Sequence, residues 1–372
     1  MLTRSFCAVK LPARKLSGNA AANTEVVLLH FGQPWTEFYA KEYLLKRAAL
    51  FYNVPSILER FIPKNLLTND TVRGCISKYG DVPSLETQVD KLAEQLEESL
   101  KTVVPEYGPI KVSRIFQFDQ LSIAEQFEQL KLSRSKKFVF VPLYPHFYGG
   151  DSGVLLAEIG QHIGNTTVPF IENNKEVRNS RIEQKSDYSF DVSTVHRWND
   201  HPIVSDYWSA KLKPELPKLD GIVFVAPRKF CYSRQEYDRS VWATCERTMT
   251  RLAHSVPWRL AFYNSWDSWD LPVRTSISSQ VKQFGDRLES KKIAIVPITD
   301  ILETFDTIHV LPKLVENLRN AVLLKPDTES DKLTQGLAEI LKNHLLGRPH
   351  RQLELMDNHF MRKDNEHCRI FY

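Results

Sequence analysis

The chain has 372 residues, of which 42% are hydrophobic and 25% are charged, so its composition is that of a folded globular protein and not of a disordered or fibrous one. It contains no run of about 18 apolar residues, which predicts that no segment spans a bilayer and that any membrane contact is peripheral. The length suits one large domain or two fused domains.

Lysine and arginine total 49 and aspartate and glutamate total 45, which gives a formal charge of +4. The first 24 residues hold four of the basic residues and no acid, so the remainder is balanced at 45 against 45 and shows no bias toward nucleic acid. This basic, acid-free leader without a long hydrophobic stretch predicts a mitochondrial transit peptide. A flexible N-terminal tail is the alternative.

Five cysteines are widely scattered, and no two have C-x-x-C spacing. This pattern supports neither a disulfide framework nor a cysteine-rich metal site. They are Cys7, Cys75, Cys231, Cys245 and Cys368.

Six short runs rich in β-branched and aromatic residues recur after the leader. Most lack strict alternation of apolar and polar residues, which is typical of strands buried on both faces of a parallel sheet. The runs are Val26–His30, Ile110–Phe118, Lys137–Tyr144, Gly221–Pro227, Arg259–Ser265 and Lys292–Ile298.

Segments with helical periodicity separate these runs. Apolar residues recur every three or four positions from Val89 to Leu100 and from Ile123 to Leu130. Further helices are predicted at Val154–Ile163, Pro202–Leu212, Arg234–His254, Thr275–Glu289, Pro312–Leu324 and Asp331–Leu345.

The alternation of strands and helices predicts an α/β protein with doubly wound parallel sheets, in which ligands bind at the carboxyl ends of the strands. Because the strands fall into two groups, we expect two similar halves facing a central cleft. The polar segment Asn173–Asp191 is expected to be an exposed excursion between them. The predicted divisions are residues 1–24 (leader), 25–200 (N-terminal half), 201–346 (C-terminal half) and 347–372 (surface tail).

Several common catalytic signatures do not occur in the chain, among them GxGxxG, the P-loop, HExxH and GxSxG. Gly149, Gly150 and Gly153 are expected to let the chain turn from the strand ending at Tyr144 into the helix beginning near Val154. The free N–H groups of that helix can face an anionic group.

A series of segments, in their order and spacing, is similar to a known family. The segments are LLHFGQP (Leu28–Pro34), VSRIFQF (Val112–Phe118), VPLYPHF (Val141–Phe147), HRWNDHP (His196–Pro202), VFVAP (Val223–Pro227), VPITDILET (Val296–Thr304) and ENLRNAVLL (Glu316–Leu324). Together they resemble ferrochelatase, and the resemblance runs from about Val26 to Leu345.

The resemblance implies two Rossmann-like halves around a porphyrin cleft, and insertion of ferrous iron into protoporphyrin to give haem. It implies a tetrapyrrole partner and a place at the matrix side of the mitochondrial inner membrane, with which the leader agrees. A homodimer and a peripheral membrane contact stay open. Some family members hold an iron–sulfur cluster on C-terminal cysteines and on one cysteine after the Y-P phrase. Here only Cys368 and Gly149 correspond, so no cluster is predicted.

Metal insertion requires a base or metal ligand over the macrocycle, because two pyrrole protons must leave. The family supplies a histidine in a phrase similar to F-S-A-H-S. Here the phrase is Phe224–Arg228 and the histidine position is Pro227, which has neither a proton acceptor nor a ligand atom. The next residue, Arg228, can pair with a porphyrin propionate.

The opposite wall of the family's site keeps its acids. The family phrase S-D-H-I-E-T is similar to Thr299–Thr304, so the resemblance assigns catalytic roles to Asp300 and Glu303 while Ile301 replaces the histidine. The alternative is that both acids are favoured there by a helix dipole.

The remaining candidates are spread along the chain. For Arg114 the alternative is an ion-pair role, and for Trp266 and Trp269 it is packing. For His146 the alternative is ordinary hydrogen bonding. The substrate-binding candidates are Phe31, Arg114, Arg228, Trp266 and Trp269, and the metal-binding candidate is His146.

Three functional hypotheses follow. The preferred one is a ferrochelatase-like protein that binds protoporphyrin or haem and inserts metal weakly or not at all. The second is an active ferrochelatase that uses Glu303 with His30 or His146 as a further base. The third is an interaction protein that keeps the fold without a cleft ligand.

Overall fold

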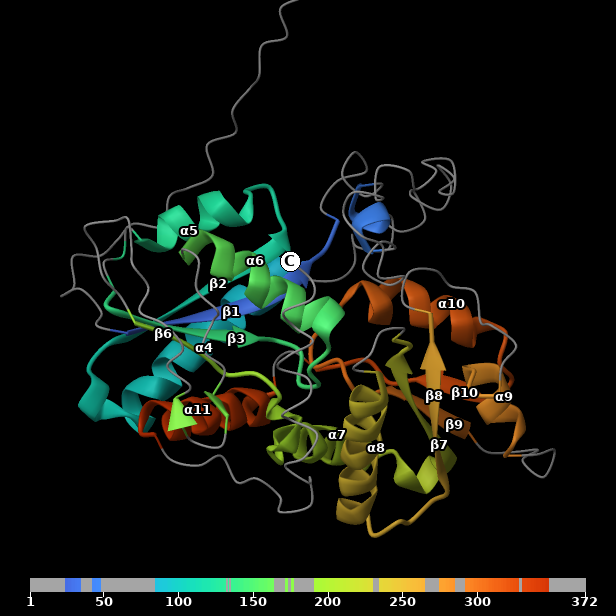
Figure 1. Ribbon diagram of the computed structural model, residues 1–372. Coiled ribbons are helices and arrows are strands. Elements are labelled where there is room, and N and C mark those ends of the chain that lie inside the picture. The colour runs from blue at the N-terminus through green and yellow to red at the C-terminus, as the bar shows by residue number, and fades with distance from the viewer. Residues whose placement is uncertain are drawn as a thin grey trace, which may run out of the picture.

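The computed structural model describes residues 24–34, 42–47, 84–131, 133, 135–163, 171–172, 175–176, 191–229, 234–264, 274–284, 292–327 and 330–347. These residues form two four-stranded parallel sheets and one short antiparallel pair, which confirms the predicted α/β class with parallel sheets (Figure 1). The predicted leader up to residue 23, the tail from 348, and Trp266 and Trp269 lie outside the described residues.

The two parallel sheets have the same topology. When the strands of each sheet are numbered in chain order, both sheets have the order second, first, third, fourth. The first sheet has the order β2-β1-β3-β6, with β1 (Thr24–Gly32), β2 (Ile110–Phe118), β3 (Lys137–Pro142) and β6 (Asp191–Thr194). The second has the order β10-β9-β7-β8, with β7 (Leu219–Pro227), β8 (Trp258–Tyr263), β9 (Lys292–Pro297) and β10 (Ala321–Leu323). For this comparison the first sheet is read from the β2 edge and the second from the β8 edge.

Strand β1, an inner strand of the first sheet, is buried on both faces, as its unbroken apolar sequence predicts. Val26 and Leu28 belong to one core cluster with α4 (Leu85–Val103). Val27 and Leu29 belong to another, with α5 (Ile123–Lys131) and α6 (Val154–Ile163). Figure 1 accordingly shows α5 and α6 on one side of this sheet and α4 on the other.

The second sheet is covered in the same way. Ile222 and Phe224 of β7 pack in the cluster that contains α8 (Arg234–Arg251). Val223 and Val225 pack in the cluster that contains α9 (Ile277–Lys282) and α10 (Leu311–Glu316). Side chains of a strand alternate between its faces, so a continuous apolar run fills both cores.

Helix α4 begins at a side-chain cap, because Ser84 Oγ accepts a hydrogen bond of 3.1 Å from Thr87 N–H. Its buried stripe packs on β2 and on α11 (Asp331–Leu345), which also contacts α7 (Ile203–Leu212). One core cluster thus draws on residues from both halves of the chain. The boundary near residue 200 stays a prediction as a division into domains.

One predicted helix is wrong in its second part. Pro312–Leu324 has helical periodicity, but α10 ends at Glu316 and Ala321–Leu323 forms the edge strand β10. A short antiparallel pair lies at the start of the expected excursion Asn173–Asp191, with β4 (Ile171–Glu172) directly before it and β5 (Lys175–Glu176) inside it. No helix among the described residues is long and apolar enough to cross a membrane.

Candidate functional site

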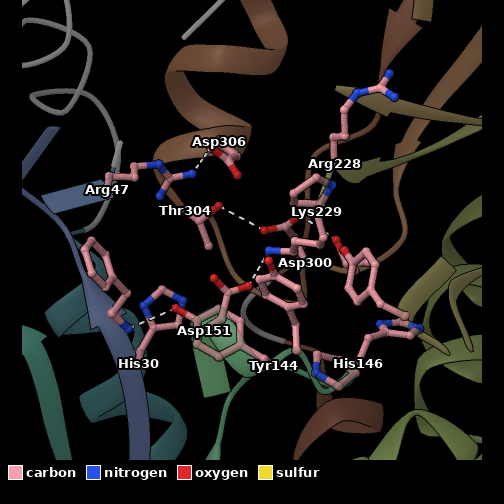
Figure 2. Close-up of a pocket in the computed structure, with 16 residues that line it drawn as sticks. His30, Arg47, Tyr144, His146, Asp151, Arg228, Lys229, Asp300, Thr304 and Asp306 are labelled. Carbon is pink, nitrogen blue, oxygen red and sulfur yellow. Dashed lines mark hydrogen bonds and ion pairs between the residues drawn. The ribbon is translucent and has the colours of Figure 1, made fainter. Parts of the chain in front are cut away.

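A pocket lies where the carboxyl ends of four strands meet (Figure 2). It is lined from the ends of β1 and β3, which are neighbours in the first sheet, and of β7 and β9, which are neighbours in the second. In each sheet this is the place where successive connections leave in opposite directions, which opens a crevice between them. The sequence-based expectation of a ligand site at the strand ends agrees with this position.

The pocket encloses about 820 Å³ of empty space, the part open to solvent at its mouth included. Four of the eight sequence candidates line it, namely Phe31, His146, Arg228 and Asp300.

His30 and Tyr144 form the wall from the first sheet. Their rings stack with centroids 4.8 Å apart and planes 24° apart. His30 Nδ1 accepts a hydrogen bond of 3.1 Å from Gly32 N–H, which places the ring proton on Nε2, and Tyr144 OH accepts one of 2.9 Å from Phe31 N–H. Burial, with a contribution from the Arg47 charge, lowers the pKa of His30 to about 3, so the imidazole is neutral at pH 7.

His146 is also held as a neutral imidazole. Burial, helped by the Arg247 charge, lowers its pKa to about 3. Its Nε2 lies 2.9 Å from Thr244 Oγ1, which itself donates to Ser240 O (3.1 Å) and accepts from Arg247 Nη2 (3.1 Å). The Nε2 atom is therefore the donor, and Nδ1 carries the lone pair.

The His146 Nδ1 atom is buried and has no hydrogen-bond partner among the described residues. A lone pair of this kind is chemically suited to a metal. The described residues, however, contain no group of three or more histidine, cysteine, aspartate or glutamate side chains that could hold a metal ion. Metal binding by His146 stays a prediction.

The wall from β7 contains Pro227, Arg228 and Lys229. The Arg228 guanidinium donates from Nη2 to Phe262 O (3.0 Å) and to Thr275 Oγ1 (3.1 Å), and Figure 2 shows it directed away from the middle of the pocket. Pro227 lines the pocket at the position where the resemblance implies a histidine.

Asp300 follows β9 and is an acid of the site with a raised pKa. It accepts hydrogen bonds from Thr304 Oγ1 (3.0 Å) and Thr299 Oγ1 (3.3 Å). Burial and the neighbouring Asp306 charge raise the pKa of Asp300 to about 7. Glu303 is not a pocket residue, although it lies only three positions further along the chain. Of the two predicted catalytic acids, the structure therefore brings only Asp300 to the site.

Two ion pairs cross the pocket between segments that are distant in the sequence. Arg47, on the helical residues 42–47, pairs with Asp306, and Lys229 pairs with Asp151 (Figure 2). Sequence reasoning missed these pairings. The signal for Lys229 was its position two residues after the end of β7, and the signal for Asp151 was its place in the glycine-rich turn Gly149–Gly153 between β3 and α6.

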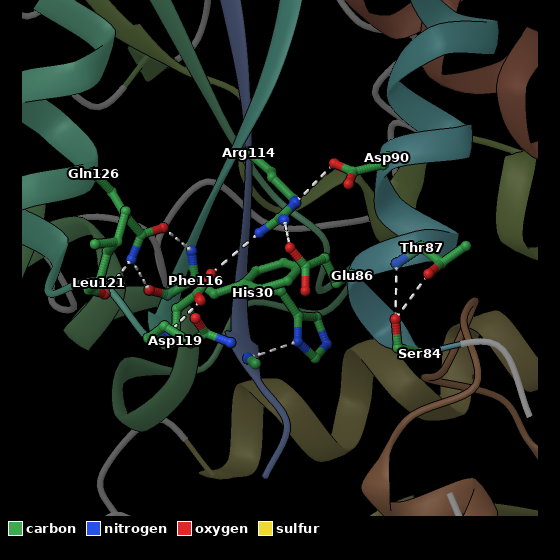
Figure 3. Close-up of polar contacts among 12 residues, drawn as sticks. His30, Ser84, Glu86, Thr87, Asp90, Arg114, Phe116, Asp119, Leu121 and Gln126 are labelled. Carbon is green, nitrogen blue, oxygen red and sulfur yellow. Dashed lines mark hydrogen bonds and ion pairs between the residues drawn. The ribbon is translucent and has the colours of Figure 1, made fainter. Parts of the chain in front are cut away.

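Arg114 lies outside the pocket (Figure 3). Its guanidinium bonds to Asp90 (2.7 Å), Asp119 (3.1 Å) and Glu86, and it stacks 4.6 Å from the centroid of the Phe116 ring. This is the ion-pair alternative for Arg114, and its predicted role in substrate binding stays a prediction.

A family model described as ferrochelatase matches residues 23–345 of the chain. No curated protein sequence matches the chain.

Solved chelatases share a low similarity with the chain. SirB from Bacillus subtilis with Fe3+ is 12% identical, with a TM-score of 0.43 over 86% of this chain and 95% of that chain. The sirohydrochlorin chelatase SirB from Bacillus subtilis subspecies spizizenii, in complex with cobalt, is 8% identical, with a TM-score of 0.42 over 86% and 94%. CbiX, described as the terminal enzyme for biosynthesis of siroheme in denitrifying bacteria, is 11% identical, with a TM-score of 0.43 over 86% and 98%.

Proposed function

The chain belongs to the ferrochelatase family, and on this basis we propose that it binds a tetrapyrrole, protoporphyrin or haem, in the pocket and inserts metal weakly or not at all. The position of the pocket at the carboxyl ends of β1, β3, β7 and β9 supports ligand binding. The stacked rings of His30 and Tyr144 offer aromatic surface to a flat macrocycle.

The proposal that metal insertion is weak or lost rests on one observation, which is that Pro227 lies in the pocket wall. A base must accept the two pyrrole protons that the metal displaces. Proline has no proton acceptor in its side chain, its neighbour Ala226 is fully buried, and Arg228 stays protonated. Loss of a general base typically slows a reaction by about 10² to 10⁴.

The first experiment separates binding from chemistry. Protoporphyrin is titrated into the purified protein while Soret absorbance and tryptophan fluorescence are followed, and ferrous iron is then added without oxygen. We expect saturable binding and turnover at least about 100-fold below that of an active ferrochelatase. A Pro227→His variant should gain turnover, with Val322→His on the exposed part of β10 as the control.

Each result has a distinct reading. Turnover near that of an active ferrochelatase contradicts the proposal. Saturable binding without turnover supports it. If no tetrapyrrole binds, the chain serves instead as an interaction protein that keeps the fold without a cleft ligand.

An active ferrochelatase is the second candidate, and Asp300 favours it. A carboxyl group with a pKa of about 7 can accept a proton at neutral pH and release it again. The neutral imidazoles of His30 and His146 lie in the same pocket. In this candidate Asp300 takes the place of Glu303, and its carboxylate receives a pyrrole proton.

A matched pair of variants tests the second candidate. If turnover is measured, Asp300→Asn should reduce it by about 100-fold or more, while Glu303→Gln should leave it within a factor of about two. The opposite pattern would return the catalytic role to Glu303.

Mitochondrial localisation is part of the proposal. Its support is the basic, acid-free composition of residues 1–24. Residues 1–30 fused to a fluorescent protein should direct it to mitochondria, and the same fusion with the four basic residues changed to glutamine should stay in the cytosol. A cytosolic unaltered fusion contradicts this localisation.

A further inference from the structure

Lys229 is a buried cation in the pocket wall. Its side chain is 10% exposed, and its ammonium lies 4.7 Å from the ring centroid of Tyr148 and 5.4 Å from that of Tyr237. Aromatic faces stabilise an ammonium, but burial of the charge still favours a nearby anion. Asp151 supplies that anion through its ion pair with Lys229.

Asp151 is placed so that it can leave this pair. Its side chain is 31% exposed, three times the exposure of Lys229, so water can take over its hydration. It lies in the π-helical turn Gly149–Gly153, before α6. If another carboxylate replaces Asp151, the ammonium keeps one negative partner, and the buried charge is not left alone.

The other two cations of the pocket are less able to exchange partners. Asp306, the partner of Arg47, has a side chain only 6% exposed and also accepts a hydrogen bond of 3.1 Å from Tyr263 OH. Its displacement would leave a buried carboxylate with little hydration, which is costly. Arg228 is bonded to the carbonyl of Phe262 and to a threonine hydroxyl.

From these contacts we propose that Lys229 binds a carboxylate side chain of the tetrapyrrole, and that Asp151 competes with the ligand for the Lys229 ammonium. The inference rests on the proposed function and adds the chemical feature that the pocket selects. A tetrapyrrole with free carboxylates should be preferred to the same macrocycle with esterified ones, because an ester carries no charge to offer the ammonium.

The test compares protoporphyrin with its dimethyl ester, both dissolved in the same non-ionic detergent, by tryptophan-fluorescence titration of the full chain. The unaltered protein should bind the diacid about tenfold or more tightly than the diester, the factor that about 1.4 kcal/mol gives. Lys229→Met should abolish this preference, and Lys229→Arg should retain it. The control is Lys218→Met on η5 (Leu216–Lys218), which removes an exposed ion pair with Glu215 and should change neither affinity.

Asp151→Asn gives an independent prediction of opposite sign. Removal of the competing carboxylate should tighten diacid binding by several-fold and leave diester binding unchanged. This gain cannot arise from a damaged fold, so it keeps the inference testable if Lys229→Met is unstable.

The outcomes separate the two proposals. Equal binding of diacid and diester, or an unchanged preference in Lys229→Met, overturns the role of Lys229 and leaves tetrapyrrole binding standing. Weaker diacid binding by Asp151→Asn overturns the competition. If neither compound binds, the proposed function fails, and this inference fails with it.

Discussion

Gln88 and Glu303 are joined by two hydrogen bonds that connect α4 to the segment after β9. Glu303 N–H donates to Gln88 Oε1 (3.0 Å), and Gln88 Nε2 donates to Glu303 O (3.3 Å). One side-chain amide thus satisfies both backbone groups of one residue. The contact fixes the backbone at Glu303 against α4, while Asp300 reaches the pocket.

Gln88→Ala should therefore destabilise the fold. Gln88 is 4% exposed, and its removal leaves two backbone groups without these partners, at a cost of about 1–3 kcal/mol in the free energy of unfolding. Urea denaturation measures the loss. Glu98→Ala on the exposed face of the same helix is the control and should cost less than about 0.5 kcal/mol. Equal losses in the two variants would show that the paired hydrogen bonds add nothing.

Gly32, at the end of β1, should not tolerate a side chain. Its φ is +96°, and an added Cβ would lie 2.2 Å from Phe118 O. Gly108 also has a positive φ of +70°, but no atom lies within 4 Å of an added Cβ there. Positive φ costs an alanine about 1–3 kcal/mol, so Gly108→Ala should lose that amount and Gly32→Ala clearly more.

Because Gly32 N–H also bonds to His30, Gly32→Ala should weaken tetrapyrrole binding while Gly108→Ala leaves the affinity unchanged. Thermal or urea denaturation and the porphyrin titration read out the two effects. Similar stability losses in both variants would show that β1 shifts freely away from Phe118.

Arg114→Met should affect stability and not ligand binding. The change keeps the packing on Phe116 but removes the cation that holds Glu86, Asp90 and Asp119 together. Two of these acids are more than half exposed, so water screens part of the loss, and we expect about 1 kcal/mol. A tenfold loss of porphyrin affinity with an intact fold would instead support the predicted role of Arg114 in substrate binding.

Asp300 should make the fold less stable as the pH rises. Its pKa is about 7 in the folded protein, raised by burial and by Asp306, against roughly 3.9 in an unfolded chain. Between these values the folded state binds more protons than the unfolded state, so stability falls as pH increases from about 4 to about 7. The nearby Arg47 charge opposes the shift but does not reverse it.

Asp300→Asn removes this pH dependence. The variant should gain a few kcal/mol relative to the unaltered protein at pH 8 and little or nothing at pH 4. Urea denaturation of both proteins at the two pH values measures the difference, in which the titration of groups that do not interact with Asp300 cancels. A difference of equal size at both pH values would mean that folding does not change the pKa of Asp300.

Part of the candidate site could be predicted from the sequence. Phe31, His146, Arg228 and Asp300 all follow predicted strands, and parallel strands bring their carboxyl ends together. Glu303 was assigned by the same phrase as Asp300, but the contact with Gln88, 215 positions away, decides where its backbone lies. A local pattern carries no information about such a partner.

The sequence by itself determined the α/β class and six of the eight strands in the two parallel sheets, because hydrophobic periodicity is a local property that burial on one or two faces imposes on each segment. The two short strands β6 and β10 were missed. The resemblance adds the expectation that Pro227 stands where the family has its histidine. Only the tertiary structure decided that Arg47 meets Asp306 across 259 positions and that Lys229 meets Asp151. Such pairs depend on which strand ends the sheet order places together, and the same charged residues would be solvated surface groups in another topology.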